Sequence, residues 1–258
     1  MKNDFLHYRS GQAYNREVFL LQHGDYVRTF DAIDTSFSNL VQPLGTLRDS
    51  NGKSYVMLIP FVFLLQRQGR AAFEAFSTFQ PYQGWVLLRP GIESVLIVGK
   101  WVDDPVNATI WVERQQDRRR YQSAYSGQAL ISKSLPASAA IRRALTKVND
   151  DFVHANPDYY SRHLRTEQPD EKTVQFWLNY HDDEVLVDAH VLAFLHLMLV
   201  MQEALAGLIG ALFDRPVDLT PLRTAFDQGF GKAITGLRGR SSEAASILEE
   251  LGLIGSTP

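Results

Sequence analysis

Two charged residues, Arg89 and Glu93, lie within an almost wholly apolar run, YQGWVLLRPGIESVLIVGKW, at residues 82–101. They are four positions apart, so in a helix they share one face and can form an ion pair. A helix that is apolar on all sides is normally buried, which places these charges inside the protein or along a cleft. Two hypotheses stay open: a structural pair that ties helices together, or part of a catalytic site.

The stretch DDFVHANPDYY, residues 150–160, places His154 in the last turn of a predicted helix, opposite its apolar face. A protonated histidine there is stabilised by the helix dipole, which is a structural role. The same side chain is a candidate general acid or base, which is a catalytic one. Asn156 follows at the turn that Pro157 imposes, and we consider it a candidate ligand-binding residue.

A third set of polar residues interrupts the apolar segment 184–213, where Asp188, His196, Gln202 and Glu203 fall within one arc of a helix. His196 and Glu203 are two turns apart, too far for direct contact, so a joint site needs a third group between them. We treat these two as candidate ligand-binding residues. The stripe of small residues at Ala189, Gly207 and Gly210 suits close helix packing, and it would admit a second helix from another subunit.

Other signatures of chemistry are missing from the sequence. It contains no cysteine, which excludes disulfides, thiolate metal sites and cysteine nucleophiles. It has no His-Glu-x-x-His or Glu-x-x-His pairing, no dinucleotide or phosphate-binding glycine loop, and no nucleophile elbow. We therefore expect neither a metal nor a cofactor. The basic cluster at Arg114, Arg118, Arg119 and Arg120 is typical of a solvated helix face, although it could touch phosphates.

The elements that must position these residues are mostly helical. Hydrophobic periodicity, prolines and polar turns predict helices over residues 14–42, 55–79, 82–101, 105–125, 135–154, 184–213, 221–237 and 241–254. The alternation in TVQFWLNYH, residues 173–181, predicts a strand, and YYSRHLR before it is its candidate partner. We predict an all-α bundle of six to eight helices with a β-hairpin at about 159–181. Residues 1–237 form one domain and 238–258 a C-terminal helical appendage.

Length, composition and charge fit a globular cytoplasmic protein. The chain has 258 residues, 45% hydrophobic, and a net charge of −3, which gives no general case for binding nucleic acid. The start, MKNDFLHYRS, has no apolar core of a signal peptide. The segment 189–213, whose only formal charge is Glu203, approaches the apolar content of a membrane span. Its histidines, Gln202 and Glu203 favour a buried core helix instead, so we expect no membrane partner.

A resemblance to a known family extends over residues 55–213. It rests on the run LLRPGIESVLIVGKWVDDP, a following helix, the stretch DDFVHANPDYY, a short β-like insertion and an apolar helix. This arrangement is similar to the HEPN (higher eukaryotes and prokaryotes nucleotide-binding) superfamily, whose members are often tied to toxin–antitoxin and phage-defence systems. Where members are ribonucleases, an arginine precedes a histidine by four to six residues. Here the residue five before His154 is Asn149, so another helix would have to supply the cation, and Arg89 is the candidate.

The resemblance implies a HEPN-like helical protein of a bacterial stress or defence system that binds or cleaves RNA. Its catalytic candidates are His154, Arg89 and Glu93. A homodimer and a cognate protein partner are further expectations of that class. The alternative is a non-enzymatic helical interaction module that dimerises through its helices.

Overall fold

The computed structural model of the chain describes residues 5–153, 164–170, 173–178 and 183–250. Within these ranges it contains ten α-helices, and the all-α class is confirmed. The helices are α1 (Phe5–Gln22), α2 (Gly24–Thr46), α3 (Ile59–Ser77), α4 (Pro81–Asp103), α5 (Val106–Val112), α6 (Arg118–Tyr125), α7 (Ser138–Val148), α9 (Glu184–Phe213), α10 (Thr220–Arg240) and α11 (Ser242–Glu250). Short 3-10 turns cover Val56–Leu58 and Gly127–Leu130.

The helix count exceeds the expected six to eight because two predicted helices are each divided. The first breaks at His23, where the backbone leaves helical geometry (φ −119°, ψ 39°) between α1 and α2. Helix α2 then continues past the expected end at Pro43 to Thr46, since a proline in the last turn removes only one hydrogen bond. The second breaks between α5 and α6, where the Asp117 side chain accepts from the backbone N–H of Arg120 and starts a new helix.

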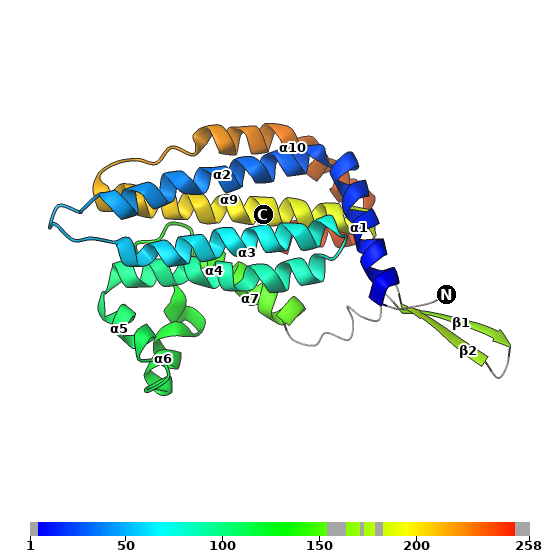
Figure 1. Cartoon of the computed structure of the whole chain (residues 1–258), viewed down its shortest axis with the longest axis horizontal. Helices are drawn as coiled ribbons and strands as arrows, with labels where there is room; N and C mark the ends of the chain where they lie inside the picture. Colours follow the sequence, from blue (N-terminus) through cyan, green and yellow to red (C-terminus); the bar gives the residue numbers. More distant parts are fainter. Residues whose placement is uncertain (1–4, 154–163, 171–172, 179–182, 251–258) are drawn as a thin grey trace.

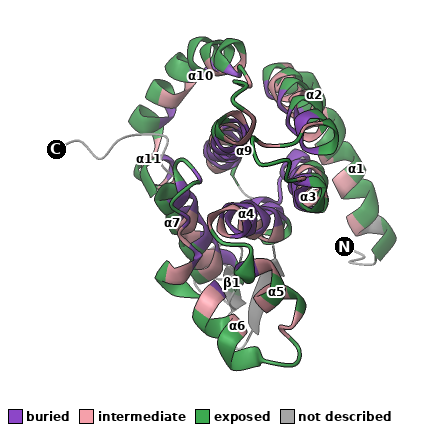
Figure 2. Ribbon diagram, turned by 90° about the vertical axis from the view of Figure 1, so that its left-hand side faces the viewer, coloured by how far each residue is buried: buried purple, intermediate pink, exposed green. Residues whose placement is uncertain are grey.

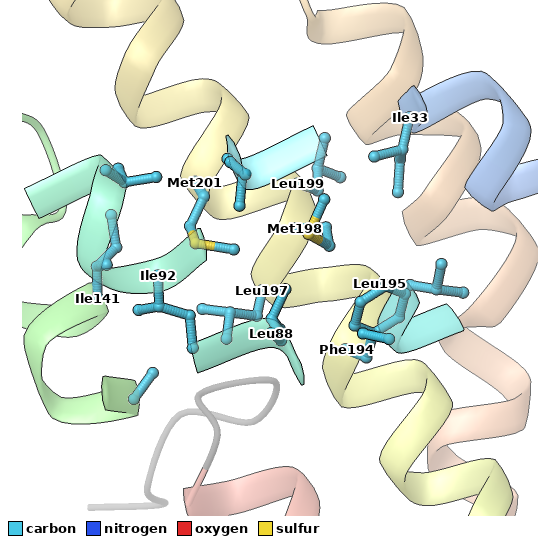
Figure 3. Close-up of a cluster of buried hydrophobic side chains, with 14 of the residues drawn as sticks. Ile33, Leu88, Ile92, Ile141, Phe194, Leu195, Leu197, Met198, Leu199 and Met201 are labelled. Carbon is cyan, nitrogen blue, oxygen red and sulfur yellow. The ribbon is translucent and has the colours of Figure 1, made fainter. Parts of the chain in front are cut away.

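Helix α9 is the centre of the bundle. Figures 1 and 2 show α2, α3, α4, α7, α10 and α11 arranged around it. In the described part of the chain α9 is the one helix long and apolar enough to cross a membrane, and 78% of its most apolar window is buried inside the protein. Figure 3 shows Met198 and Leu199 of α9 in the cluster of buried side chains between Ile33 of α2 and Ile92 of α4.

Two polar side chains within this core have partners. Gln202 of α9 is fully buried, and its amide donates to the carbonyl of Ile33 at 2.7 Å and accepts from Ser36 at 2.8 Å. His190 accepts from the indole N–H of Trp85 on α4 at 3.0 Å. Both contacts satisfy groups that would otherwise destabilise an apolar interior, and they tie α9 to α2 and α4.

Helix α4 lies against α3 on one side and α7 on the other (Figure 1). Its approach to the segment before α7 depends on Gly99, where an added Cβ would come within 2.7 Å of the Ser132 Cβ. Asp103, at the end of α4, accepts from the backbone N–H groups of Lys133 and Ser134 at 2.9 Å each. The segment from α5 to the start of α7 is thus anchored at the end of α4.

Helix α7 runs into a π-helical turn at Asn149–Val153, which extends the amphipathic helix predicted at 135–154. Strands β1 (Leu164–Asp170) and β2 (Thr173–Leu178) pair antiparallel, with Leu164 opposite Leu178 and an irregularity between Glu167 and Asp170. The other parts of the hairpin expected at about 159–181 lie outside the described residues.

The C-terminal helices belong to the same packed unit as the rest. Helix α10 continues beyond the expected boundary at residue 237 and ends at Arg240. Helix α11 packs against α9, and its Ala244 and Leu248 are fully buried. The segment expected to be an appendage therefore contributes side chains to the core.

Candidate functional site

Arg89 and Glu93 of α4 form the ion pair that their spacing predicts. The Arg89 Nη1 lies 3.2 Å from the Glu93 Oε2. The pair is only half-buried, since 35% of the Arg89 side chain and 26% of the Glu93 side chain are exposed. Helix α4 was expected to be buried on all sides, but Val86 and Leu87 are also exposed, so one side of the helix faces solvent. Water therefore reaches the pair.

Arg89 has a second partner that comes from another element. Its Nε donates to the Oδ1 of Asn149 at 2.6 Å. Asn149 begins the π-helical turn after α7, a type of local distortion that is frequent at functional sites. This turn is fixed on α4 by the buried Phe152, whose ring centroid lies 6.0 Å from those of both Tyr82 and Trp85. The packing of Phe152 thus sets the position of Asn149.

A guanidinium carries five N–H donors, and contacts with Asn149 and Glu93 use two of those of Arg89. Across the described residues no further partner of Arg89 is present. Its remaining donors and partial exposure allow it to bind an anion from solvent. His154 and Asn156, the other residues predicted for this site, lie outside the described residues.

Tyr121 of α6 and Arg114, in the turn before α6, extend this site. Burial raises the pKa of Tyr121, the charge of Glu93 raises it further, and Arg114 and Arg89 oppose the shift. The Tyr121 hydroxyl therefore lies near all three charged groups. The Arg114 guanidinium lies 3.9 Å from the ring centroid of Trp111, a cation–π contact that holds it at this place.

Arg223 of α10, which the sequence analysis did not identify, pairs with Glu203 and lies near enough to His196 to affect its pKa. The Arg223 Nε donates to the Glu203 Oε1 at 2.8 Å, and its Nη2 contacts the second carboxylate oxygen. The Nδ1 of His196 is buried and has no hydrogen-bond partner among the described residues. Burial, and then the charge of Arg223, lower the pKa of His196 to about 4.

A cleft of about 830 Å³ lies beside this group, between the end of α9 and the start of α10. Glu203 and Arg223 line it together with Gly207 and Gly210. Of the small-residue stripe, Gly207 is exposed and Gly210 is half-buried, whereas Ala189 is fully buried. The Cβ position of Gly207 is 3.0 Å from Pro136, and that of Gly210 is 3.5 Å from the backbone of Arg215 and Pro216.

A third polar cluster, at the junction of α1 and α2, was missed by the sequence analysis. The His23 Nδ1 lies 3.4 Å from the Asp188 Oδ1 on α9, and the Tyr26 hydroxyl hydrogen-bonds to the same carboxylate. Burial raises the pKa of Asp188, against the opposing effects of His23 and Tyr26. Burial and then Asp188 raise the pKa of Tyr26. The side chain of His23 is 11% exposed, so the cluster is closed to large ligands.

The three clusters differ in what they can offer to a ligand. Arg223 is engaged by the carboxylate of Glu203, and His23 is enclosed. Arg89 combines a permanent positive charge with exposure and unused donors, so we consider its surroundings the candidate site. Comparison of the chain with protein-family models, with curated proteins and with solved structures finds no match.

Proposed function

We propose that the protein is a HEPN-like helical protein of a bacterial stress or defence system that binds RNA and cleaves it without a metal. The observation that carries the proposal is the 2.6 Å hydrogen bond from Arg89 to Asn149. Asn149 precedes His154 by five residues, within the interval of four to six residues at which HEPN ribonucleases have an arginine. A tertiary contact from α4 thus brings an arginine to a place where the local sequence has none.

The chemistry requires a cation and a group that transfers protons. The RNA 2′-oxygen attacks the adjacent phosphorus and loses its proton to a general base, while the bond from phosphorus to the 5′-oxygen breaks and that oxygen gains a proton. The products are a 2′,3′-cyclic phosphate and a 5′-hydroxyl. In this proposal His154 transfers a proton, and Arg89 stabilises the negative charge that accumulates on the phosphate oxygens. Glu93 orients the guanidinium.

The proposal is tested by incubating the purified protein with single-stranded RNA in excess chelator and identifying the new ends. We expect cyclic-phosphate ends from the wild type and a loss of about 10²–10³-fold in rate for Arg89→Ala, the range for losing one stabiliser of transition-state charge. His154→Ala should lose activity as well. Arg67→Ala is the matched control, because Arg67 is an exposed arginine of α3. Cleavage that survives both site substitutions would refute the assignment.

A second candidate is a helical module that dimerises or binds a cognate protein without catalysis. It is favoured by the exposed apolar side chains of α1, where Phe5, Leu6 and Leu21 are 70%, 74% and 86% exposed. These side chains lie at the two ends of α1, and large exposed apolar side chains are a feature of protein interfaces. Absence of cleavage by the wild type, together with a stable dimer, would favour this module over the ribonuclease.

A further inference from the structure

The segment that contains α5, α6 and α7 differs in charge from the rest of the chain. Residues 106–148 contain eight arginines and lysines and two acidic residues, a net charge of +6, whereas the whole chain has a net charge of −3. The remainder of the chain therefore carries −9. Such segregation produces a local positive potential that attracts polyanions even though the protein as a whole is acidic.

Helix α6 concentrates this charge in an unfavourable place for its own stability. Its first turn consists of Arg118, Arg119 and Arg120 and contains no acidic residue. The amino end of a helix carries a partial positive charge, so cations there destabilise the helix. Arg120 is compensated by Glu113 at 3.7 Å, but Arg118 and Arg119 are exposed and have no partner among the described residues. Asp117 caps the helix and offsets part of this charge, and retention of these two arginines is consistent with a functional role that costs stability.

This basic surface lies near the candidate site, because α5 packs against α4 and Arg114 stacks on Trp111 just before α6. Tyr121, one turn after Arg118 on α6, lies within electrostatic reach of Arg89, Glu93 and Arg114. Figure 1 shows α5 next to the end of α4 and α6 beyond α5, and Figure 2 shows that α6 is largely exposed at the edge of the bundle. A strand of RNA that places one phosphate at Arg89 would therefore pass along the start of α6.

We infer that the first turn of α6, with Arg118 and Arg119, together with Arg114 is the surface that binds the phosphates of single-stranded RNA next to the one held by Arg89. The choice of RNA as the polyanion rests on the proposed function. Binding of this kind depends on salt, because each neutralised phosphate releases counterions. It does not require a particular base sequence, since arginines on an exposed helix turn contact the backbone.

The test is fluorescence anisotropy with a labelled single-stranded RNA whose 2′-hydroxyls are methylated, so that binding is measured without cleavage. Affinity is measured between 0.05 and about 0.5 M salt for the wild type and for Arg118→Ala/Arg119→Ala. Loss of two phosphate contacts should lower the slope of log affinity against log salt by about 1.4. If the wild type and the variant have equal affinities at about 1 M salt, this difference in slope makes the affinity of the variant about 25-fold lower at about 0.1 M salt.

The matched control is Arg9→Ala/Arg67→Ala, which removes the same charge from exposed arginines of α1 and α3. It should keep the wild-type slope. Thermal unfolding should show that the α6 variant is at least as stable as the wild type, because two cations leave the first turn. Any of three results would overturn the inference: an equal loss of affinity in both double variants, no loss of affinity in the α6 variant, or no RNA binding by the wild type.

The two proposals can fail separately in these experiments. A wild type that cleaves unmodified RNA while the α6 variant binds normally would refute the binding surface and leave the ribonuclease in place. A wild type that binds through α6 and does not cleave would refute the ribonuclease and leave the binding surface.

Discussion

Replacement of His196 should change how the stability of the protein depends on pH. His196 lies on α9 with its Nδ1 buried and without a partner among the described residues. Burial first, and then the charge of Arg223, hold its pKa at about 4, against an ordinary value of 6.5, while Glu203 opposes the shift. The folded protein therefore keeps this side chain neutral at pH values where the unfolded chain binds a proton.

The sign and the magnitude follow from this difference in proton binding. Between pH 6.5 and 4 the unfolded state binds more protons at His196 than the folded state does. The contribution of His196 to the free energy of unfolding is therefore fully present above this window and is lost as the pH falls through it. Between pH 7.5 and pH 5, protonation of His196 in the unfolded state lowers the free energy of unfolding by about 2 kcal/mol. Below pH 4 this decrease reaches its limit of about 3 kcal/mol.

Urea unfolding of the wild type and of His196→Leu at pH 7.5 and pH 5 measures this effect. The wild type should lose about 2 kcal/mol more than the variant between the two pH values, since the contributions of all other groups cancel in the comparison. Leu199→Met, a change at a buried position of the same helix, serves as a control that should lose as much as the wild type. An identical pH dependence in wild type and His196→Leu would refute the reasoning.

Three further predictions concern packing, charge and assembly. Glu93→Ala should cost about 1 kcal/mol in urea unfolding, because solvent reaches Arg89; a loss of about 3–5 kcal/mol would instead indicate a fully buried pair. Gly99→Ala should lower the free energy of unfolding by about 1–3 kcal/mol, because the added Cβ would press on Ser132. Gly231→Ala, in open space on α10, is the control and should be neutral or stabilising. Equal effects of the two substitutions would contradict the packing at Gly99. Sedimentation should show a dimer that Leu6→Ser/Leu21→Ser dissociates, and a wild-type monomer at micromolar concentration would refute this use of α1.

The sequence was sufficient for features that depend on local periodicity. The expected helix at 184–213 matches α9, and the run at 82–101 matches α4 to within two residues, because long apolar segments bounded by polar turns leave few alternatives. The i, i+4 pairing of Arg89 with Glu93 was also visible, since helical spacing alone determines it.

Features that depend on contacts between distant segments were not visible. Asn149 meets Arg89 across 60 positions, and Arg223 meets Glu203 from another helix, so neither contact leaves a spacing signal. The breaks at His23 and between α5 and α6 were missed because each lies within continuous helical periodicity. The Asp117 cap at the start of α6 was a local signal that could have shown the second break.

The central proposal is that Arg89 supplies, from α4, the cation that HEPN ribonucleases carry four to six residues before their histidine. Moving the arginine tests it most directly. The rate of RNA cleavage in chelator is measured for the wild type, Arg89→Ala, and the double variant Arg89→Ala/Asn149→Arg, with thermal unfolding to confirm that each is folded. We predict that Arg89→Ala loses about 10²–10³-fold in rate and that the double variant regains cleavage, because the new arginine at position 149 lies where Arg89 now contacts Asn149. A folded double variant as inactive as Arg89→Ala, or full activity in Arg89→Ala, would contradict it.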